Sequence, residues 1–125
     1  MLANQGQAAE AVTLLDPVSA AATANATSAW VAASEYEGDL VFTVQIGALT
    51  GSLTWTIEHA SDGSGTGAAG ITPNEGAFAA GAANQTQKRT VNASAIAGFV
   101  RVVGTIVTGP VLVAASLMSH PKYTS

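Results

Sequence analysis

The sequence contains no cysteine, which excludes disulfides, thiolate chemistry and cysteine-ligated zinc sites. Charge is also scarce: only 10% of the 125 residues are Asp, Glu, Lys or Arg, against about 25% in an average soluble protein. Four residues are basic and the net charge is -4, which argues against nucleic acid as a partner, because such binding relies on Lys and Arg. Scarce charge together with 48% apolar residues favours a protein that lives inside an assembly.

Long uncharged apolar runs are also missing, and a membrane span needs roughly 18 such residues. The most hydrophobic stretch, residues 93–118, is interrupted by Arg101 and by Gly109-Pro110. We therefore expect two buried strands joined by a turn in this stretch, and no membrane partner. The first residues also lack the basic segment and apolar run of a signal peptide.

The pattern along the chain predicts one β domain between two irregular ends. Residues 1–11, rich in Ala, Gln and Asn, are expected to form a flexible or extended arm, residues 12–118 the domain, and residues 119–125 a tail. A first strand over 12–16 is expected to stop at Pro17, which cannot donate to a strand ladder. About seven to nine short strands separated by turns predict an all-β fold, an antiparallel two-sheet β-sandwich that is jelly-roll-like or Ig-like.

Alternation of apolar and polar residues is clearest in residues 40–46 and 52–59. The five residues between them fit a hairpin loop, so residues 39–60 are expected to form an antiparallel hairpin. Residues 99–107 and 111–118 are expected to form a second pair of apolar strands. The expected core comprises Phe42, Trp55, Ile57, Phe99, Val103 and Val113.

No group of residues indicates catalysis, so we expect no enzyme activity, no cofactor and no metal. Residues 65–70 spell G-x-G-x-x-G, but no helical pattern follows, so a flexible loop is expected instead of a dinucleotide site. His59 and His120 lack the converging ligands of a metal site, and His59 is expected to hydrogen-bond at a strand end. The acidic run 35–39 predicts a solvated turn rather than a calcium loop.

A resemblance to small virion proteins of tailed bacteriophages begins at Trp30. In those proteins a strand ends in H-x-x-D-G, here residues 59–63, and a later strand carries Y/F-V-R, here residues 99–101. The similarity covers roughly residues 27–118. It implies a β-sandwich capsid decoration (cement) protein, commonly a trimer, that binds the major capsid protein on the outside of the head and does no chemistry. It carries over no site residues.

Two other interpretations remain open: another virion component, such as a head fibre or tail module, and a carbohydrate-binding β-sandwich that would use exposed aromatics among Trp30, Tyr36 and Tyr123. The low charge and the resemblance together predict a homotrimer. The basic pair at 88–89 is equally well explained as edge charge that prevents aggregation. Capsid or subunit contacts are expected from the arm, the acidic turn, the basic pair and the loop ends, with the candidates Leu2, Asn4, Gln5, Gln7, Glu35, Tyr36, Glu37, Lys88 and Arg89.

Overall fold

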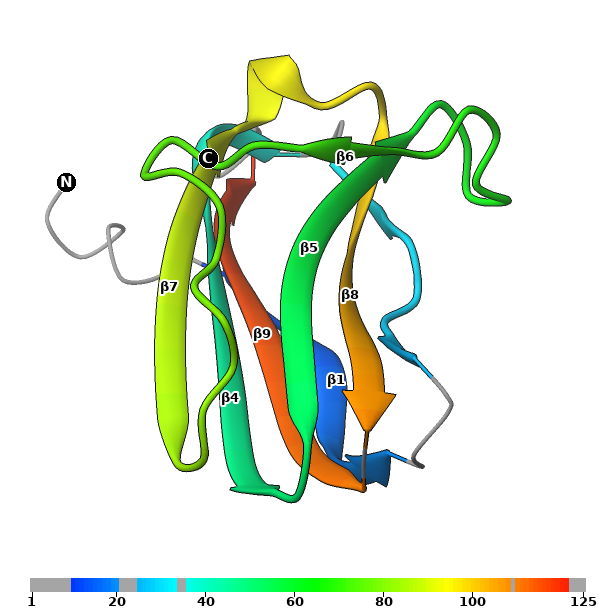
Figure 1. The fold of residues 1–125 in the computed structure, drawn as a ribbon. Helices are drawn as coiled ribbons and strands as arrows, with labels where there is room; N and C mark the ends of the chain where they lie inside the picture. Colours follow the sequence, from blue (N-terminus) through cyan, green and yellow to red (C-terminus); the bar gives the residue numbers. More distant parts are fainter. Residues whose placement is uncertain (1–9, 21–24, 34–35, 109, 122–125) are drawn as a thin grey trace, which may run out of the picture.

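The computed structural model describes residues 10–20, 25–33, 36–108 and 110–121 (Figure 1). Two antiparallel sheets pack together as a β-sandwich, which confirms the predicted fold class. The described residues hold no α-helix, only a short 3-10 turn, η2 (Ala93–Ala95). The strands are β1 (Glu10–Ala20), β2 (Ala26–Thr27), β3 (Val31–Ala32), β4 (Tyr36–Leu49), β5 (Ser52–Ala60), β6 (Ala69–Ile71), β7 (Gln85–Asn92), β8 (Phe99–Thr108) and β9 (Val111–Pro121).

The strand order is that of a jelly roll. One layer, sheet A, has the order β1-β9-β4-β7, and the other, sheet B, has the order β2-β8-β5-β6, with β3 also paired to β8. An Ig-like sandwich keeps its first two strands side by side in one sheet, whereas β1 and β2 here lie in different sheets. Of the two predicted architectures, the structure therefore has the jelly roll.

The hairpin expected over residues 39–60 is wrong. β4 pairs with β7 and β9, while β5 pairs with β6 and β8, so the turn at Thr50-Gly51 carries the chain from one sheet to the other. β8 and β9 likewise lie in opposite sheets. Alternation shows that one face of a strand is buried, but it does not show whether the next strand lies beside it or across the core.

The two terminal strands are longer than expected. β1 runs from Glu10 through Pro17, with shifts of register on either side of Leu15, because an edge strand tolerates proline at such irregularities. β9 ends at Pro121, and Ser119 is fully buried and paired with Glu10. The sheet therefore extends beyond the expected domain limits of 12 and 118 on both sides.

The core lies between the two sheets. β4 and β5 supply alternate buried side chains, and β9 supplies the same pattern from Val111 to Leu117. Trp55 packs against Gly104 of β8, where an added Cβ would stand 3.1 Å from the ring. Phe42, Trp55, Ile57 and Val113 lie in this core, as expected. Val103 is buried but outside the core cluster, and Phe99 is half-buried at the start of β8, where its ring lies near Gly63.

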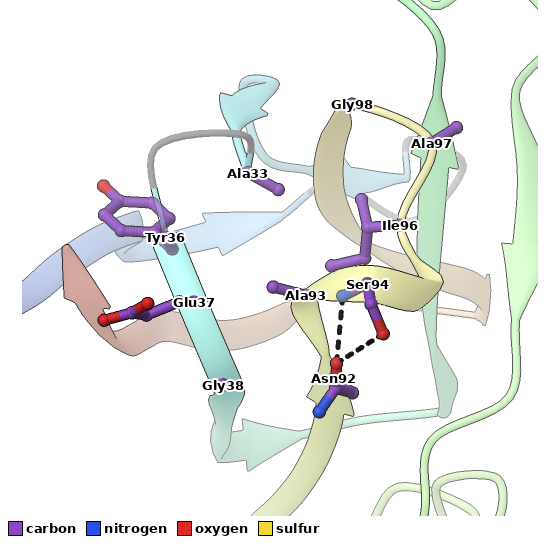
Figure 2. A pocket seen from close by; sticks show the side chains of 10 residues that line it. All are labelled: Ala33, Tyr36, Glu37, Gly38, Asn92, Ala93, Ser94, Ile96, Ala97 and Gly98. Atoms are coloured by element: carbon purple, nitrogen blue, oxygen red, sulfur yellow. Dashed lines mark hydrogen bonds between the residues drawn. The ribbon is translucent and has the colours of Figure 1, made fainter. Parts of the chain in front are cut away.

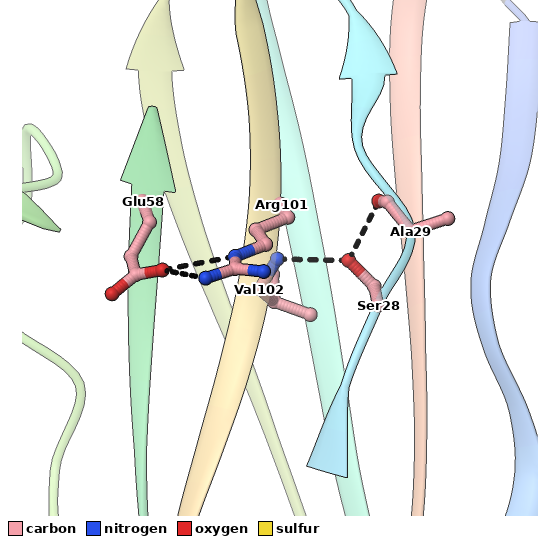
Figure 3. Close-up of polar contacts among 5 residues, drawn as sticks. All are labelled: Ser28, Ala29, Glu58, Arg101 and Val102. Atoms are coloured by element: carbon pink, nitrogen blue, oxygen red, sulfur yellow. Dashed lines mark hydrogen bonds and ion pairs between the residues drawn. The ribbon is translucent and has the colours of Figure 1, made fainter. Parts of the chain in front are cut away.

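An interruption separates β2 from β3 along the edge of β8. Buried Ser28 lies in this gap, and its backbone N–H donates to the Val102 carbonyl at 3.0 Å. Its hydroxyl accepts from the Val102 N–H, also at 3.0 Å, and donates to the Ala29 carbonyl (Figure 3). A side-chain oxygen thus replaces the missing strand acceptor, which leaves the β8 edge satisfied at this point.

Candidate functional site

A hollow of about 330 Å³ opens at one end of the sandwich, between the start of β4 and η2 (Figure 2). Its polar groups largely serve the local backbone: Asn92 Oδ1 accepts from the Ser94 N–H at 3.0 Å and from the Ser94 hydroxyl at 2.7 Å, which caps η2. Glu37 is the charged side chain in its lining, which comprises Ala33, Tyr36, Glu37, Gly38, Asn92, Ala93, Ser94, Ile96, Ala97 and Gly98.

The acidic turn only partly matches its expected role as a contact surface. Glu37 is exposed, but Tyr36 is 6% exposed at the start of β4, where it pairs with Pro121. The expectation that Tyr36 offers an exposed aromatic ring is therefore wrong. Glu35 lies outside the described residues, as do Leu2, Asn4, Gln5, Gln7 and Tyr123.

The two residues of the basic pair differ: Lys88 is exposed, whereas Arg89 is hydrogen-bonded within the protein. Arg89 Nε donates to the Gly76 carbonyl at 3.2 Å and Nη2 to the Ala77 carbonyl at 3.3 Å, while the guanidinium lies 5.3 Å from the Phe78 ring centroid. Lys88 points outward and is exposed. Lys88 alone therefore offers its charge freely to a partner, and it lies about 20 Å along β4 from the acidic turn.

Residues 72–84 form a long connection that runs along the open side of the sandwich between β7 and β5 (Figure 1). Buried Gln87 holds it to sheet A, accepting from the Ala79 N–H at 2.9 Å and donating to the Ala79 carbonyl at 3.1 Å. The Gly81 N–H holds it to sheet B by donating to the Leu53 carbonyl at 2.9 Å. The connection thus closes this side of the core.

Glu75 fixes the same connection at its first turn. The Glu75 carboxylate accepts from the Thr90 hydroxyl at 2.7 Å and from the Thr90 N–H at 2.8 Å. Both hydrogen bonds favour the ionised form, so they hold the pKa of Glu75 below its ordinary value.

The glycine-rich loop between β5 and β6 is organised by its own carboxylate. Asp62 accepts from the Thr66 hydroxyl at 2.6 Å and from the N–H groups of Ser64 and Thr66 at 2.9 and 3.1 Å. The Thr66 hydroxyl, followed by these amides, lowers the pKa of Asp62. Residues 61–68 form a loop, as expected, but strand β6 begins at Ala69, within the G-x-G-x-x-G stretch, where a dinucleotide site needs a helix.

A stacked ion pair occupies the outer face of sheet B (Figure 3). Arg101 Nε and Nη2 both donate to Glu58 Oε1, at 2.9 and 2.7 Å, and the guanidinium lies 4.3 Å from the Trp30 ring centroid. The backbone at Gly65 packs against the same ring, since an added Cβ there would stand 3.2 Å from Nε1. Sequence reasoning missed this cluster because Glu58 and Arg101 meet only through the pairing of β5 with β8.

His59 has the structural role expected of it. Its Nδ1 accepts from the Ala97 N–H at 3.1 Å, which ties the end of β5 to the segment before β8. Within the described ranges no three His, Asp or Glu residues come together in a way that could hold a metal ion. The same ranges contain no helix long and apolar enough to cross a membrane.

No protein-family model and no curated protein matches the sequence. Solved structures do match the fold. SPBc2 prophage-derived protein YomS superposes with a TM-score of 0.54 at 9% identity, over 89% of this chain and 92% of that one. A chain from the structure of infectious bursal disease virus, Gx strain, superposes with a TM-score of 0.53 at 10% identity, over 93% of this chain and 33% of that one. At these identities the likeness concerns the fold.

Proposed function

We propose that this chain is a bacteriophage virion protein, and specifically a capsid decoration (cement) protein that binds the major capsid protein on the outside of the head. The observation that carries the proposal is the jelly-roll sandwich, which the chain shares along most of its length with a prophage-derived protein. Part of a chain from the structure of infectious bursal disease virus has a similar fold. The sequence resemblance to phage virion proteins points the same way.

The physical properties of the fold suit a protein that strengthens a shell. Its long connections are fixed to the sheets: Gln87 and Arg89 hold residues 72–84, and Asp62 holds the glycine-rich loop. A ligand that binds only the assembled shell stabilises it by about 2.7 kcal/mol per site at a hundredfold excess over Kd. We propose that the chain acts as a homotrimer, since several linked contacts multiply weak affinities.

The described aromatic side chains give little support to a carbohydrate-binding function. Tyr36 and Trp55 are buried, and Arg101 covers the Trp30 ring. Phe99 packs over Gly63. A sugar platform needs an open ring face, and none of these rings offers one.

The location of the chain on purified particles tests the proposal. Phage heads lacking the chain are mixed with purified protein and imaged by electron cryomicroscopy, with unassembled major capsid protein as the control. We expect added density at repeated positions on the outer lattice and no binding to unassembled subunits. Density confined to the tail or to fibres would show a different virion component, and absence of density on the particle would contradict a virion role.

A further inference from the structure

The two central strands of sheet A, β9 and β4, differ from the rest of the described surface in their lack of charge over most of their length. They carry no charged side chain from Val41 to Gly47 or from Val111 to Ser119. The outer face of sheet B, by contrast, carries the Glu58–Arg101 ion pair. Lys88, on edge strand β7, lies at the margin of the uncharged area.

Two large apolar side chains project from this face. Leu112 is 44% exposed and Met118 is 50% exposed, and both lie on the outward side of β9, the strand between β1 and β4. The residues paired around them are uncharged. Met118 pairs with Val41 of β4, and between Met118 and Leu112 the hydroxylated Ser116 pairs with Thr43. Covering such side chains costs less free energy than covering charged ones.

A hollow of about 340 Å³ lies beside Leu112 on the same face. Leu112 stands at its rim, where its Cδ2 approaches the backbone of Gly47 closely enough that an added Cβ would be 3.1 Å away. The other lining residues come from β4, β7, β9 and the end of the connection before β7, and comprise Gln45, Ile46, Gly47, Asn84, Gln85, Thr86, Val113 and Ala114.

We infer that copies of this chain contact each other through the outer face of sheet A, with Leu112 of one copy seated in the hollow of its neighbour. Each copy carries both a projection and a hollow on this face, so the projection of one copy can fit the hollow of another. The charge supports the same occupant. Two copies of a chain with a net charge of -4 repel each other least where the contacting strands carry no charge.

The size of the face predicts a modest affinity. Four strands about 4.8 Å apart, with roughly seven residues each, give a flat area of roughly 450 Å² per copy. Two such faces together cover about 900 Å², below the roughly 1,200 Å² at which stable specific interfaces begin and in the range of weak, transient contacts. Self-association should therefore depend on concentration. The inference goes beyond the proposed function, since self-contact does not require that the partner lattice be a capsid.

Sedimentation velocity across the micromolar range tests the inference with two variants of equal charge change. Leu112→Glu places a carboxylate in the proposed contact, and Thr54→Glu places one on the exposed outer face of sheet B. We expect the wild type and Thr54→Glu to associate, and Leu112→Glu to associate about tenfold more weakly or worse, since an unpaired buried charge exceeds 1.4 kcal/mol. Met118→Glu, at the other end of β9, should act like Leu112→Glu and covers the case in which that variant misfolds.

Two results would overturn the inference: a wild type that stays monomeric throughout the range, or equal association of Leu112→Glu and Thr54→Glu. If the wild type is monomeric and Leu112→Glu also loses head binding, this face docks the lattice rather than a second copy. That last result would leave the proposed function standing, so the two failures are distinguishable.

Discussion

Trp55 shows how the packing of the sandwich depends on paired positions. Its ring fills the space left by Gly104, the residue opposite it on β8. The indole Nε1 is buried and has no hydrogen-bond partner among the described residues. The side chain therefore contributes through its packed surface rather than through hydrogen bonding.

Replacement of Trp55 by Ala should lower the free energy of unfolding by about 3–5 kcal/mol, as for other buried aromatics. Trp55→Phe should cost less, because the ring remains and no hydrogen bond is lost. Urea denaturation measures both, with exposed Thr54→Ala as the control, expected within about 0.5 kcal/mol of the wild type. If Trp55→Ala unfolded at the same urea concentration as the wild type, the burial of this ring would be wrong.

Gly81 is required by space rather than by backbone conformation. An added Cβ would lie 2.6 Å from Ile46 Cδ1 and 2.6 Å from the Leu53 carbonyl oxygen. Gly81→Ala should therefore destabilise the protein by about 1–3 kcal/mol. Gly70→Ala is the matched control, since the Cβ there meets only Thr56 at an ordinary 3.7 Å. Equal melting temperatures for the two variants in thermal unfolding would contradict the close approach at Gly81.

The Thr66 hydroxyl should set the ionisation of Asp62. Thr66→Val removes the largest cause of the lowered pKa, so the pKa of Asp62 should rise toward its ordinary value. Carbon-detected NMR titration of the carboxyl groups measures the change, and Glu75, held by Thr90 on another loop, serves as the internal control. An unchanged pKa for Asp62 in Thr66→Val would contradict the hydrogen bond.

The sign of the resulting pH dependence follows from the lowered pKa. A carboxylate whose pKa is depressed in the folded state stabilises that state above its unfolded-state pKa, and this contribution disappears as the pH falls through the folded value. The backbone amides of Ser64 and Thr66 donate to Asp62. Once Asp62 is protonated, hydrogen exchange at these two amides should be faster than the intrinsic pH dependence of amide exchange predicts.

At the scale of elements, the connection from 72 to 84 depends on strand β7. Arg89 and Lys88 are adjacent and carry the same charge, but only Arg89 contacts this connection, through Gly76, Ala77 and Phe78. Pairing of Phe42 with Arg89 and of Thr43 with Lys88 explains the difference, because Phe42 faces the core. The sequence identifies a basic pair, but only the register tells which member turns inward.

Arg89→Ala should loosen the connection, and Lys88→Ala should not. We expect Arg89→Ala to lose about 1–3 kcal/mol of stability, because it leaves carbonyl groups without their donors. Limited proteolysis should then cut within 72–84 first. Lys88→Ala removes the same charge from an exposed site and should stay within about 0.5 kcal/mol of the wild type. Equal protease sensitivity in the two variants would show that Arg89 does not hold the connection.

The positions of the strands along the chain were largely predictable from the sequence, whereas the pairing of strands within the sheets was not. The alternation in residues 40–46 and 52–59 corresponds to β4 and β5. The hairpin expected from 39 to 60 failed because the jelly roll places β4 and β5 in opposite sheets, where each buries one face. For the same reason the meeting of Glu58 with Arg101 could not be found from spacing alone.

At the scale of the whole molecule, the jelly roll combines a fixed body with a sheet whose two central strands carry no charge from Val41 to Gly47 and from Val111 to Ser119. Connections on the open side are tied down by Gln87, Arg89 and Glu75, so most polar groups there serve the fold. Leu112 and Met118 are left exposed on the outer face of sheet A. Such a molecule is built to add contacts within an assembly, which is the role we propose for it on a phage head.

Heating of phage particles with and without the chain tests this account most directly. Particles lacking the chain are divided, one half is restored with purified protein, and the temperature of DNA release is followed with a fluorescent dye. The account predicts that restored particles release DNA at a higher temperature, and that the increase saturates as sites fill. Equal release temperatures for restored and unrestored particles, with the protein shown to be bound, would contradict a stabilising role.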